Sequence, residues 1–315
     1  MKHENVVLFD NAGLPSIMVK FTPEAGKSLA PVFMICGRRA KAIYISKYGN
    51  TLVKGVPCSI PFAQPANCID FATASALCRG KGDGWHLMTN AEWEYLYNES
   101  LEGSTLPHGN TASGRYYLDD SESGEKYDYG HTLAGSGPVT WSHTHTPDGV
   151  YDLCGNNWEM TAGLRLRKGA IEYIKDNDAA VVDLSPGSEA WQQAKTAAGE
   201  IIYLDAGCGG IIVTTEAPED CWNGGRFKGM GIALDEVPEI LQQLGIVPKN
   251  VKEETATIYA DTGEEEAVPL RGSSFYDAYN GGLGALCLHY ARYFVHHSVG
   301  FRSAYVEFEE RETEN

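Results

Sequence analysis

Residues 271–302 read RGSSFYDAYNGGLGALCLHYARYFVHHSVGFR, and they are the most informative part of the chain. A buried element would be apolar at regular spacing, and a solvated loop would be polar throughout. This stretch is neither, because Gly, Ala and Leu alternate with Tyr, His, Asp and Asn between an RGSSF start and a GFR end. Such a mixture is typical of a binding surface, where Tyr supplies rigid contact area and His, Asp and Asn supply adaptable hydrogen bonds.

The composition of the whole chain is that of a folded, acidic protein. It has 315 residues, 43% of them hydrophobic, which is enough for a sizeable core in one large domain or two ordinary ones. The net charge is −17, from 25 Lys and Arg against 42 Asp and Glu residues. Phosphate binding needs a basic surface, so we expect no nucleic-acid partner. An anionic membrane surface is disfavoured for the same reason.

The sequence shows no signal for secretion or membrane insertion. Its start, MKHENVVLFDNAG, lacks the apolar stretch of a signal peptide, and no run of about 18 apolar residues occurs. The eight cysteines form no CxxC pair, so we expect reduced, buried thiols and no zinc knuckle or thioredoxin-like motif. The location stays open between cytoplasm, cell surface and virion.

Local patterns place several elements in the first third of the chain. VVLFD and SIMVKF predict two strands around a turn at residues 11–13, inside an N-terminal extension over residues 1–30. A helix is expected over about residues 70–79. Thr89 and Glu92 then form a capping box that begins a second helix, with one buried stripe.

Residues 164–265 are the least legible part of the chain. LRLRKGAIEYI predicts a pair of strands. Ser185-Pro186 is expected to cap and open one helix, and Asp235 to cap another that ends near Gly245. The acidic run at residues 264–266 is expected to be a solvated loop.

Three motifs occur in a fixed order: GWHLMTNAEWEYL (84–96), GVYDLCGNNWEM (149–160) and the RGSSF…GFRSA frame (271–304). Together they resemble the formylglycine-generating-enzyme branch of the C-type lectin fold, over roughly residues 32–306. The resemblance implies an α+β fold with two helices around mixed or antiparallel sheets and long irregular loops. It makes residues 31–310 one C-type-lectin-like domain, with an insertion at about 164–265.

Five residues of these motifs are expected to serve the fold. Short polar side chains that bond their own backbone suit a tight turn, and a large ring can anchor it in the core. Arginines at the two ends of the last segment are expected to hold carbonyls or carboxylates. These residues are Asp152, Asn156, Trp158, Arg271 and Arg302.

Catalysis is one function open to this fold. Formylglycine-generating enzymes use two cysteines in the last segment to bind copper and oxidise a substrate cysteine. Here Cys287 stands alone, and Tyr276 lies about where the first cysteine would be expected. One thiolate cannot form a two-thiolate site, so we expect no catalytic residue, no metal and no cofactor. The pairs His143/His145 and His296/His297 are expected to lie in loops or at the surface.

The last segment also resembles the variable region of proteins encoded by diversity-generating retroelements. In those systems a template rich in Asn codons is copied with changes at adenines, and the copy replaces the 3′ end of the gene. Tyr, Asp, His, Ser, Asn, Val and Cys are reached in this way. The invariant frame of such segments is matched by Arg271, Gly272, Ser273, Gly282, Ala285, Leu286, Leu288, Gly300, Phe301 and Arg302.

The positions between the frame residues are then the expected ligand-binding, variable positions. They are Ser274, Tyr276, Asp277, Tyr279, Asn280, Cys287, His289, Tyr290, Tyr293, Val295, His296 and His297. The resemblance implies a non-catalytic protein that binds a receptor, either a protein or another macromolecule, as phage or prophage variable proteins do. Two alternatives stay open: an oxidoreductase of the formylglycine-generating type with a divergent site, and a structural virion or surface module of fixed sequence. Whether the chain forms a homo-oligomer cannot be read from the sequence.

Overall fold

The computed structural model describes residues 3–24, 26, 28–251 and 255–309. Residue 310, the expected end of the domain, lies outside the described residues. Most regular structure within them is strand, arranged in mixed and antiparallel sheets with three α-helices and long irregular connections. The α+β class expected from the sequence is therefore confirmed. None of these helices combines the length and the apolar character that crossing a bilayer requires.

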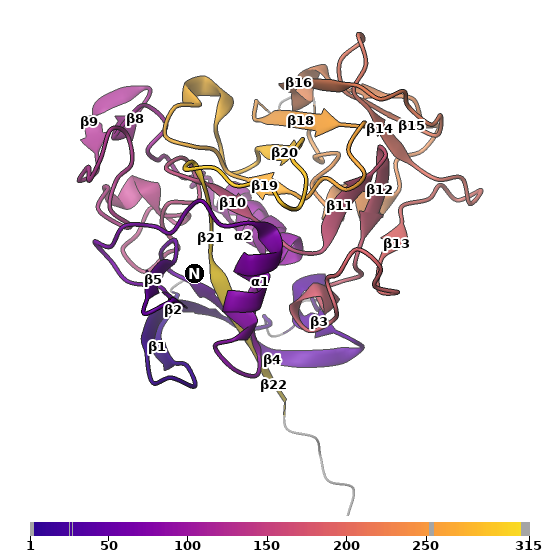
Figure 1. Ribbon diagram of the computed structural model, residues 1–315. Coiled ribbons are helices and arrows are strands. Elements are labelled where there is room, and N and C mark those ends of the chain that lie inside the picture. Colours follow the sequence, from indigo (N-terminus) through magenta and orange to yellow (C-terminus); the bar gives the residue numbers. More distant parts are fainter. Residues whose placement is uncertain (1–2, 25, 27, 252–254, 310–315) are drawn as a thin grey trace, which may run out of the picture.

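The first sheet joins the two ends of the described chain (Figure 1). In spatial order it contains β1 (Glu4–Phe9), β2 (Pro15–Phe21), β4 (Arg38–Ser46), β22 (Ser303–Phe308) and β7 (Trp85–Leu87), with β3 (Met34–Ile35) paired to β4. The predicted strands around the turn at residues 11–13 are thus β1 and β2. They lie within the expected N-terminal extension, and β2 pairs directly with β4.

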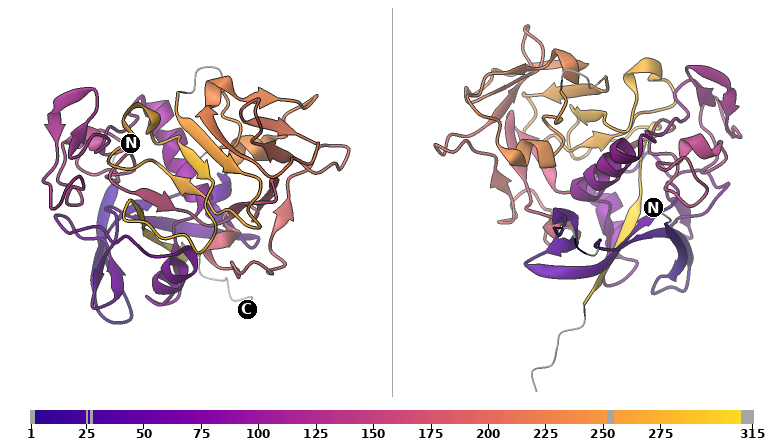
Figure 2. Two further views of the ribbon diagram at one scale, coloured as in Figure 1. Left: turned by 45° about the horizontal axis from the view of Figure 1, so that its top comes forward. Right: turned by 180° about the vertical axis from the view of Figure 1, so that it is seen from behind.

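The two predicted helices are present, and the capping box predicted for the second is confirmed. α1 (Phe71–Arg79) begins after Asp70, whose carboxylate accepts a hydrogen bond from the Thr73 amide at 2.7 Å. α2 (Asn90–Gly103) begins with the capping box, in which the Glu92 amide donates to Thr89 and the Thr89 amide donates to Glu92. Figure 2 shows α2 between the first sheet and the second sheet.

The second sheet brings the sequence motifs together. In spatial order it contains β16 (Trp222–Arg226), β18 (Thr257–Asp261), β20 (Leu286–Leu288), β19 (Leu270–Arg271), β10 (Trp158–Met160) and β21 (Val299–Phe301). β10 carries the WEM motif and lies between the two ends of the last segment, antiparallel to β19 and parallel to β21. Long-range strand pairing therefore joins motifs that are more than a hundred residues apart.

A third sheet and two hairpins complete the strands. The third sheet contains β11 (Leu164–Arg167), β12 (Ala170–Tyr173), β14 (Tyr203–Asp205), β15 (Ile212–Thr214) and β17 (Gly231–Ile232), with β13 (Gln192–Gln193) paired to β12. The hairpins are β5 (Thr51–Val53) with β6 (Val56–Cys58), and β8 (Arg115–Tyr116) with β9 (Asp119–Ser123). The predicted strand pair LRLRKGAIEYI is confirmed as β11 and β12.

Residues 164–265 share the core of the rest of the chain. One buried cluster contains Leu166 and Val213 of the third sheet together with Leu286 and Phe301 of the last segment. The same region also supplies β16 and β18 to the second sheet. Removing this region would therefore expose apolar surface that the last segment packs against.

One helix prediction in this region is wrong, and a second is confirmed only for its end near Gly245. At Ser185 there is no helix, because the Ser185 amide and hydroxyl both bond the Asp183 carboxylate in a local turn. The helix expected from Asp235 is only α3 (Glu239–Gln243). Pro238 disfavours helical geometry at the residue before it, so the helix begins after the proline.

The predicted solvated loop at residues 264–266 is wrong for its last residue. Glu266 is partly buried and pairs with Arg165 at 2.8 Å and Arg292 at 2.6 Å. Burial alone would raise the pKa of Glu266, but hydrogen bonds from the two arginines outweigh it and lower the pKa. The ion cluster joins β11 to the last segment.

All eight cysteines are free, as expected from their spacing. Only half of them are the buried thiols expected from composition. Cys58, Cys78, Cys154 and Cys287 are buried, Cys221 is partly exposed, and Cys36, Cys68 and Cys208 are exposed.

Candidate ligand-binding surface

The first end of the last segment is fixed by a buried arginine. The Arg271 guanidinium is fully buried and donates to the side-chain oxygen of Asn90 at 2.7 and 3.0 Å. It also donates to the carbonyl of Leu244 at 2.7 Å and pairs with Glu94 at 2.9 Å. Asn90 and Glu94 lie on the first turns of α2, so Arg271 joins the last segment to that helix.

The second end is fixed by another buried arginine. Arg302 pairs with both carboxylate oxygens of Glu159, with Nε at 2.6 Å from Oε2. Its remaining donors bond the carbonyls of Ser46 at 2.9 Å and Tyr151 at 3.1 Å. A buried charge persists only when it is paired and hydrogen-bonded, and this one has both kinds of partner. The structural role expected for Arg271 and Arg302 is confirmed.

The turn of the GNNWEM motif is hydrogen-bonded to the start of the last segment. Asn156 has a left-handed backbone (φ 64°), and its side chain bonds the amide and carbonyl of Thr132 at 2.9 Å. Gly155 donates to the Ser273 hydroxyl at 2.9 Å, and the Phe275 amide donates to the Asn156 carbonyl at 3.1 Å. Asp152 is buried nearby, and burial raises its pKa to about 6.

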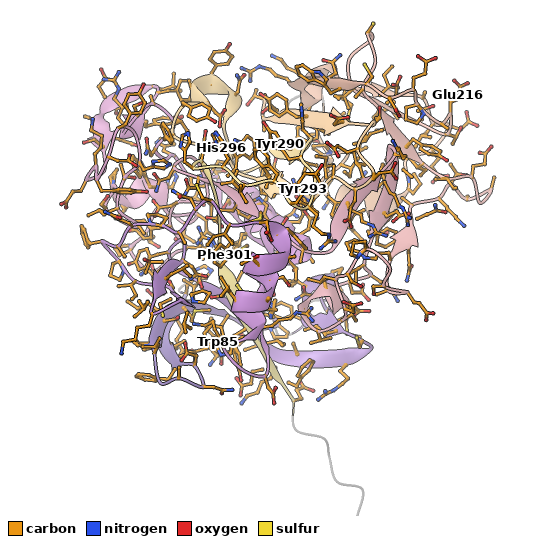
Figure 3. The ribbon with its side chains drawn as sticks, in the orientation of Figure 1. Trp85, Glu216, Tyr290, Tyr293, His296 and Phe301 are labelled. Carbon is orange, nitrogen blue, oxygen red and sulfur yellow. The ribbon has the colours of Figure 1, made fainter. Side chains whose placement is uncertain are left out.

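The middle of the segment carries exposed side chains. Tyr276 is 52% exposed, Tyr279 59%, Tyr293 77% and Val295 50%. Tyr290, Tyr293 and His296 lie near β19 and β20 in Figure 3. Of the other predicted positions, His297 is exposed, and a further group is partly exposed: Asp277, Asn280, His289, Tyr290 and His296. Ten of the twelve predicted positions thus lie at least partly at the surface.

Ser274 and Cys287 are the two predicted positions that the structure does not bring to the surface. Ser274 is fully buried, and its amide and hydroxyl both donate to the Asp277 carboxylate. Cys287 is 4% exposed and lies in β20, between β18 and β19. Burial raises the pKa of its thiol to about 12, so the protonated thiol is the favoured form at neutral pH.

One cluster of metal-ligand residue types was not found from the sequence. His3, Glu99 and His143 place one ligand atom each within 4.8 Å of one another. However, His143 Nδ1 accepts a hydrogen bond from the Val150 amide at 2.8 Å, so a neutral ring carries its proton on Nε2, the atom that faces Glu99. His3 pairs with Glu99 at 2.7 Å. The three side chains therefore form a His–Glu–His contact that holds the N-terminus on α2.

The charge of this cluster depends on burial. Burial alone would raise the pKa of Glu99, but hydrogen bonds and charge from His143 and His3 outweigh it and bring the pKa to about 2. Burial lowers the pKa of His143 despite the neighbouring carboxylate. The sequence analysis singled out only His143, because residues about 40 and 100 positions apart in the chain form this contact.

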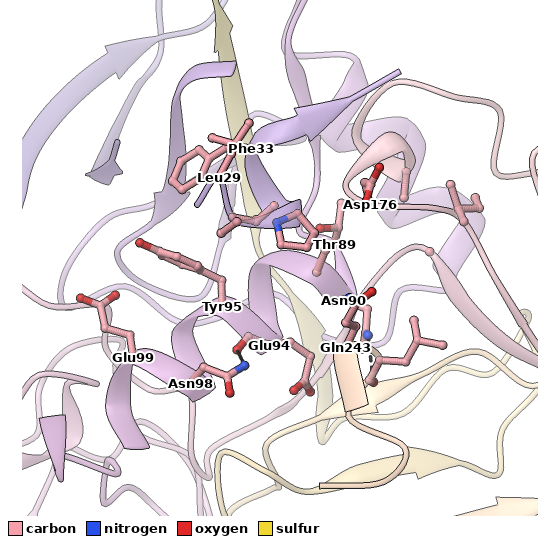
Figure 4. Close-up of a pocket in the computed structure, with 18 of the residues that line it drawn as sticks. Leu29, Phe33, Thr89, Asn90, Glu94, Tyr95, Asn98, Glu99, Asp176 and Gln243 are labelled. Atoms are coloured by element: carbon pink, nitrogen blue, oxygen red, sulfur yellow. Dashed lines mark hydrogen bonds between the residues drawn. The ribbon is translucent and has the colours of Figure 1, made fainter. Parts of the chain in front are cut away.

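A cavity of about 290 Å³ lies elsewhere, between α2, α3 and residues 23–33 (Figure 4). Its wall combines apolar groups such as Leu29, Phe33 and Tyr95 with five carboxylates, and none of its described lining residues is Lys, Arg or His. The carboxylates are Glu24, Glu94, Glu99, Glu102 and Asp176. None of the twelve predicted positions lines it. No periodic pattern in the sequence predicted this cavity, since four separate segments of the chain line it.

Comparison with protein families gives a match that covers two of the three sequence motifs. A family model described as "Sulfatase-modifying factor enzyme 1-like domain" matches residues 47–197, just under half of the chain. This match covers α1, α2 and the GNNWEM turn but not residues 271–302. It confirms the expected C-type lectin fold of the formylglycine-generating-enzyme type. Comparison with curated proteins gives no significant match.

Solved structures are also similar to this chain, including the following three. The P3c variant of the Major Tropism Determinant is 11% identical with a TM-score of 0.35, covering 98% of this chain and 64% of that one. Its U1 variant is 12% identical with a TM-score of 0.36, covering 95% and 59%. Treponema denticola variable protein 1 is 11% identical with a TM-score of 0.36, covering 96% and 98%.

One of these structures is named a variable protein, and the other two are named variants of a Major Tropism Determinant. This chain spans only 59–64% of the length of the two tropism determinants. At this identity the likeness concerns the fold alone.

Proposed function

We propose that this protein is a non-catalytic binding protein whose segment 271–302 presents variable side chains on a fixed frame. The observation that carries the proposal is the contrast within this segment. Arg271 and Arg302 are fully buried at its ends, while Tyr276, Tyr279 and Tyr293 are 52–77% exposed between them. A surface that keeps its frame buried can change its exposed side chains at little cost to folding.

The ligand we propose is a protein or another macromolecule that acts as a receptor. Exposed tyrosines are the residues that most often anchor such interfaces, because a large ring contributes contact area with few rotatable bonds. The proposed contact positions are the predicted ones at the surface, with Tyr276, Tyr279, Tyr290 and Tyr293 as anchors. Ser274 and Cys287 would act through the shape of the surface, since both are buried. A virion, or display through a partner, is the proposed location.

Alanine substitution of the four tyrosines tests the binding role. The ligand is first identified by chemical cross-linking to surface proteins of the source community and then purified. Each variant is expected to weaken ligand binding by roughly tenfold, the effect typical of an interface anchor, while its circular dichroism and unfolding midpoint stay unchanged. Phe9→Ala, which truncates a 67% exposed ring on β1, is the control. Unchanged affinity in all four tyrosine variants would falsify the proposal.

The proposed source of variation is a retroelement that copies a template with changes at adenines. Sequencing of codons 271–302 in the source population, with a search of the flanking DNA for a near-copy, tests this step. We expect the codons of the twelve predicted positions to vary and the frame codons to stay fixed. Mismatches should fall at adenines of the template. An invariant segment without a second copy contradicts the retroelement and leaves a binding module of fixed sequence.

An oxidoreductase is the second candidate, because the matched family model is that of a sulfatase-modifying factor. Cys287 is the only cysteine of the last segment, and it is a buried thiol with a raised pKa. We therefore expect the purified protein, loaded with Cu(I), to consume no oxygen in the presence of a cysteine-containing peptide. Oxygen consumption that Cys287→Ser abolishes would favour the enzyme over the binding protein.

A further inference from the structure

A continuous row of aromatic rings crosses the proposed binding surface. It begins with Trp222 and His289, whose ring centroids are 5.2 Å apart, and continues to Tyr290 at 4.7 Å and Phe294 at 3.9 Å. From Phe294 it passes to His296 at 6.0 Å, to His297 at 4.2 Å, to Phe275 at 5.8 Å and to Tyr129 at 6.5 Å. We call these eight side chains the aromatic row.

Both ends of the aromatic row come from outside residues 271–302. Trp222 lies in β16 and is 63% exposed, whereas Tyr129 lies in the loop after β9 and is 88% exposed. The other tryptophans of the chain are buried or partly buried. A large ring held at the surface at each end of a contiguous row is an arrangement that folding alone does not require.

Each end also pairs its exposed ring with a carboxylate. Trp222 lies opposite Asp261 in the register of β16 and β18, and the Asp261 carboxylate is 3.8 Å from the His289 ring nitrogen. At the other end, Tyr129 follows Asp128, whose side chain is 42% exposed and contacts His131 Nδ1 at 2.9 Å. Burial alone would raise the pKa of Asp128, but hydrogen bonds from His131 and Gly130 together outweigh it and lower the pKa. A carboxylate thus stands on the residue opposite Trp222 in the sheet and on the residue before Tyr129 in the chain.

The arginines near the row are already engaged. Arg226 lies 5.3 Å over the Tyr279 ring and donates to the Thr255 carbonyl. Arg292 is paired with Glu266. These two arginines are held by partners within the chain, and the net charge of −17 favours a basic ligand.

We propose that Trp222 and Tyr129, each with its neighbouring carboxylate, are fixed anchors that bind Arg or Lys side chains of a protein ligand. Guanidinium and ammonium groups bind over the faces of Trp and Tyr rings, and a carboxylate beside the ring supplies the ionic partner. The variable positions of the row lie between these anchors. This inference rests on the proposed binding role and adds to it the charge of the ligand and two residues outside segment 271–302.

Two matched peptides test the inference on the full-length protein. The first is acetyl-Gly-Arg-Gly-Arg-Gly-amide, and the second replaces both arginines with citrulline, which has nearly the same shape without the charge. Binding is followed by the ¹⁹F resonance of Trp222 in protein labelled with 5-fluorotryptophan. That resonance is assigned with Trp222→Phe. We expect the arginine peptide to shift it and the citrulline peptide to bind more weakly by about two- to fivefold, as for an exposed cation over a ring.

Variants then locate the contact, with binding of the arginine peptide measured by calorimetry. Trp222→Ala, Asp261→Asn, Tyr129→Ala and Asp128→Asn are each expected to weaken it by about two- to fivefold. Phe9→Ala removes an exposed ring from β1, far from β16 in Figure 1, and should change nothing. Equal affinity for the two peptides, or unchanged affinity in Trp222→Ala and Tyr129→Ala, overturns the inference.

Failure of the inference can be told apart from failure of the proposed function. If codons 271–302 vary and the tyrosine variants lose their ligand, but the two peptides bind alike, the binding role stands and the fixed cation anchors are wrong. If the codons are invariant and the tyrosine variants bind normally, the proposed function is wrong. Arginine selectivity that depends on Trp222 would in that case still support the two anchors as a site for basic peptides.

Discussion

The ends and the middle of the last segment differ in what their side chains do. Residues 271–275 and 298–302 are buried without exception, and their arginines bond α2, β4 and β10. Residues 276–297 alternate between buried frame positions and exposed rings, of which Tyr293 is 77% exposed. Folding and ligand contact are thus assigned to different residues of one short segment. Substitutions should separate the two roles.

The largest expected effect is at the second end. Arg302→Ala leaves Glu159 buried without its cationic partner and removes the bonds to the Ser46 and Tyr151 carbonyls. Breaking a buried pair in this way costs about 3–5 kcal/mol, and we expect that loss in the free energy of unfolding measured with urea. Arg39→Ala, which removes a pair at the surface, should stay within about 0.5 kcal/mol. Similar losses in both variants would contradict the contrast.

The sequence predicted those features that depend on neighbouring residues. The capping box of Thr89 and Glu92, the helix α1 and the turn between β1 and β2 each depend on residues close together in the sequence. The frame of residues 271–302 was predicted as well, because its motif fixes the spacing of Arg271 and Arg302. In the structure both arginines form buried ion pairs, with Glu94 and Glu159.

Features that depend on tertiary contacts could not be predicted. Glu266 was expected in solvent, yet two arginines from other segments enclose it. The position of Trp222 beside His289 could not be predicted, because it depends on the pairing of β16 with β18. Ser274 and Cys287 fit the pattern of variable codons, but codon patterns carry no information on burial. The twelve contact positions and the division at residues 30 and 310 stay predictions.

The second largest expected effect concerns the buried carboxyl group of Asp152. Burial raises the pKa of Asp152 to about 6 from 3.8, and one of its oxygens has no hydrogen-bond partner among the described residues. A raised pKa in the folded state favours the protonated form, so Asp152 lowers stability as pH rises from about 4 to about 6. Relative to wild type, Asp152→Asn should gain about 2–3 kcal/mol over this range and then stay level. Urea unfolding at five pH values measures the difference.

A control separates burial from other effects of removing a charge. Asp148 is partly exposed, and a hydrogen bond from Thr146 lowers its pKa. The same comparison for Asp148→Asn should therefore not rise with pH. Parallel profiles for Asp152→Asn and wild type would mean that Asp152 titrates at its ordinary pKa when folded.

A smaller effect separates two predicted variable positions. Cys287→Tyr forces a large ring into β20, which is enclosed by β18 and β19, and overpacking of this kind costs about 1–3 kcal/mol. Val295→Tyr adds the same ring at a side chain that is 50% exposed and should change stability by less than about 0.5 kcal/mol. Thermal and urea unfolding of the two variants measure this contrast. If both are equally stable, burial does not limit which positions can vary.

The smallest expected effect on stability belongs to the most exposed ring of the segment. Tyr293 is 77% exposed and takes part in no hydrogen bond or ring contact within the described residues. Tyr293→Ser should therefore change the free energy of unfolding by less than about 0.5 kcal/mol, although Tyr and Ser differ greatly in contact area. If the proposed function is right, the same variant loses affinity for the ligand. Loss of stability together with loss of binding would instead mean that Tyr293 belongs to the frame, and the separation between the ends and the middle of the segment would no longer hold.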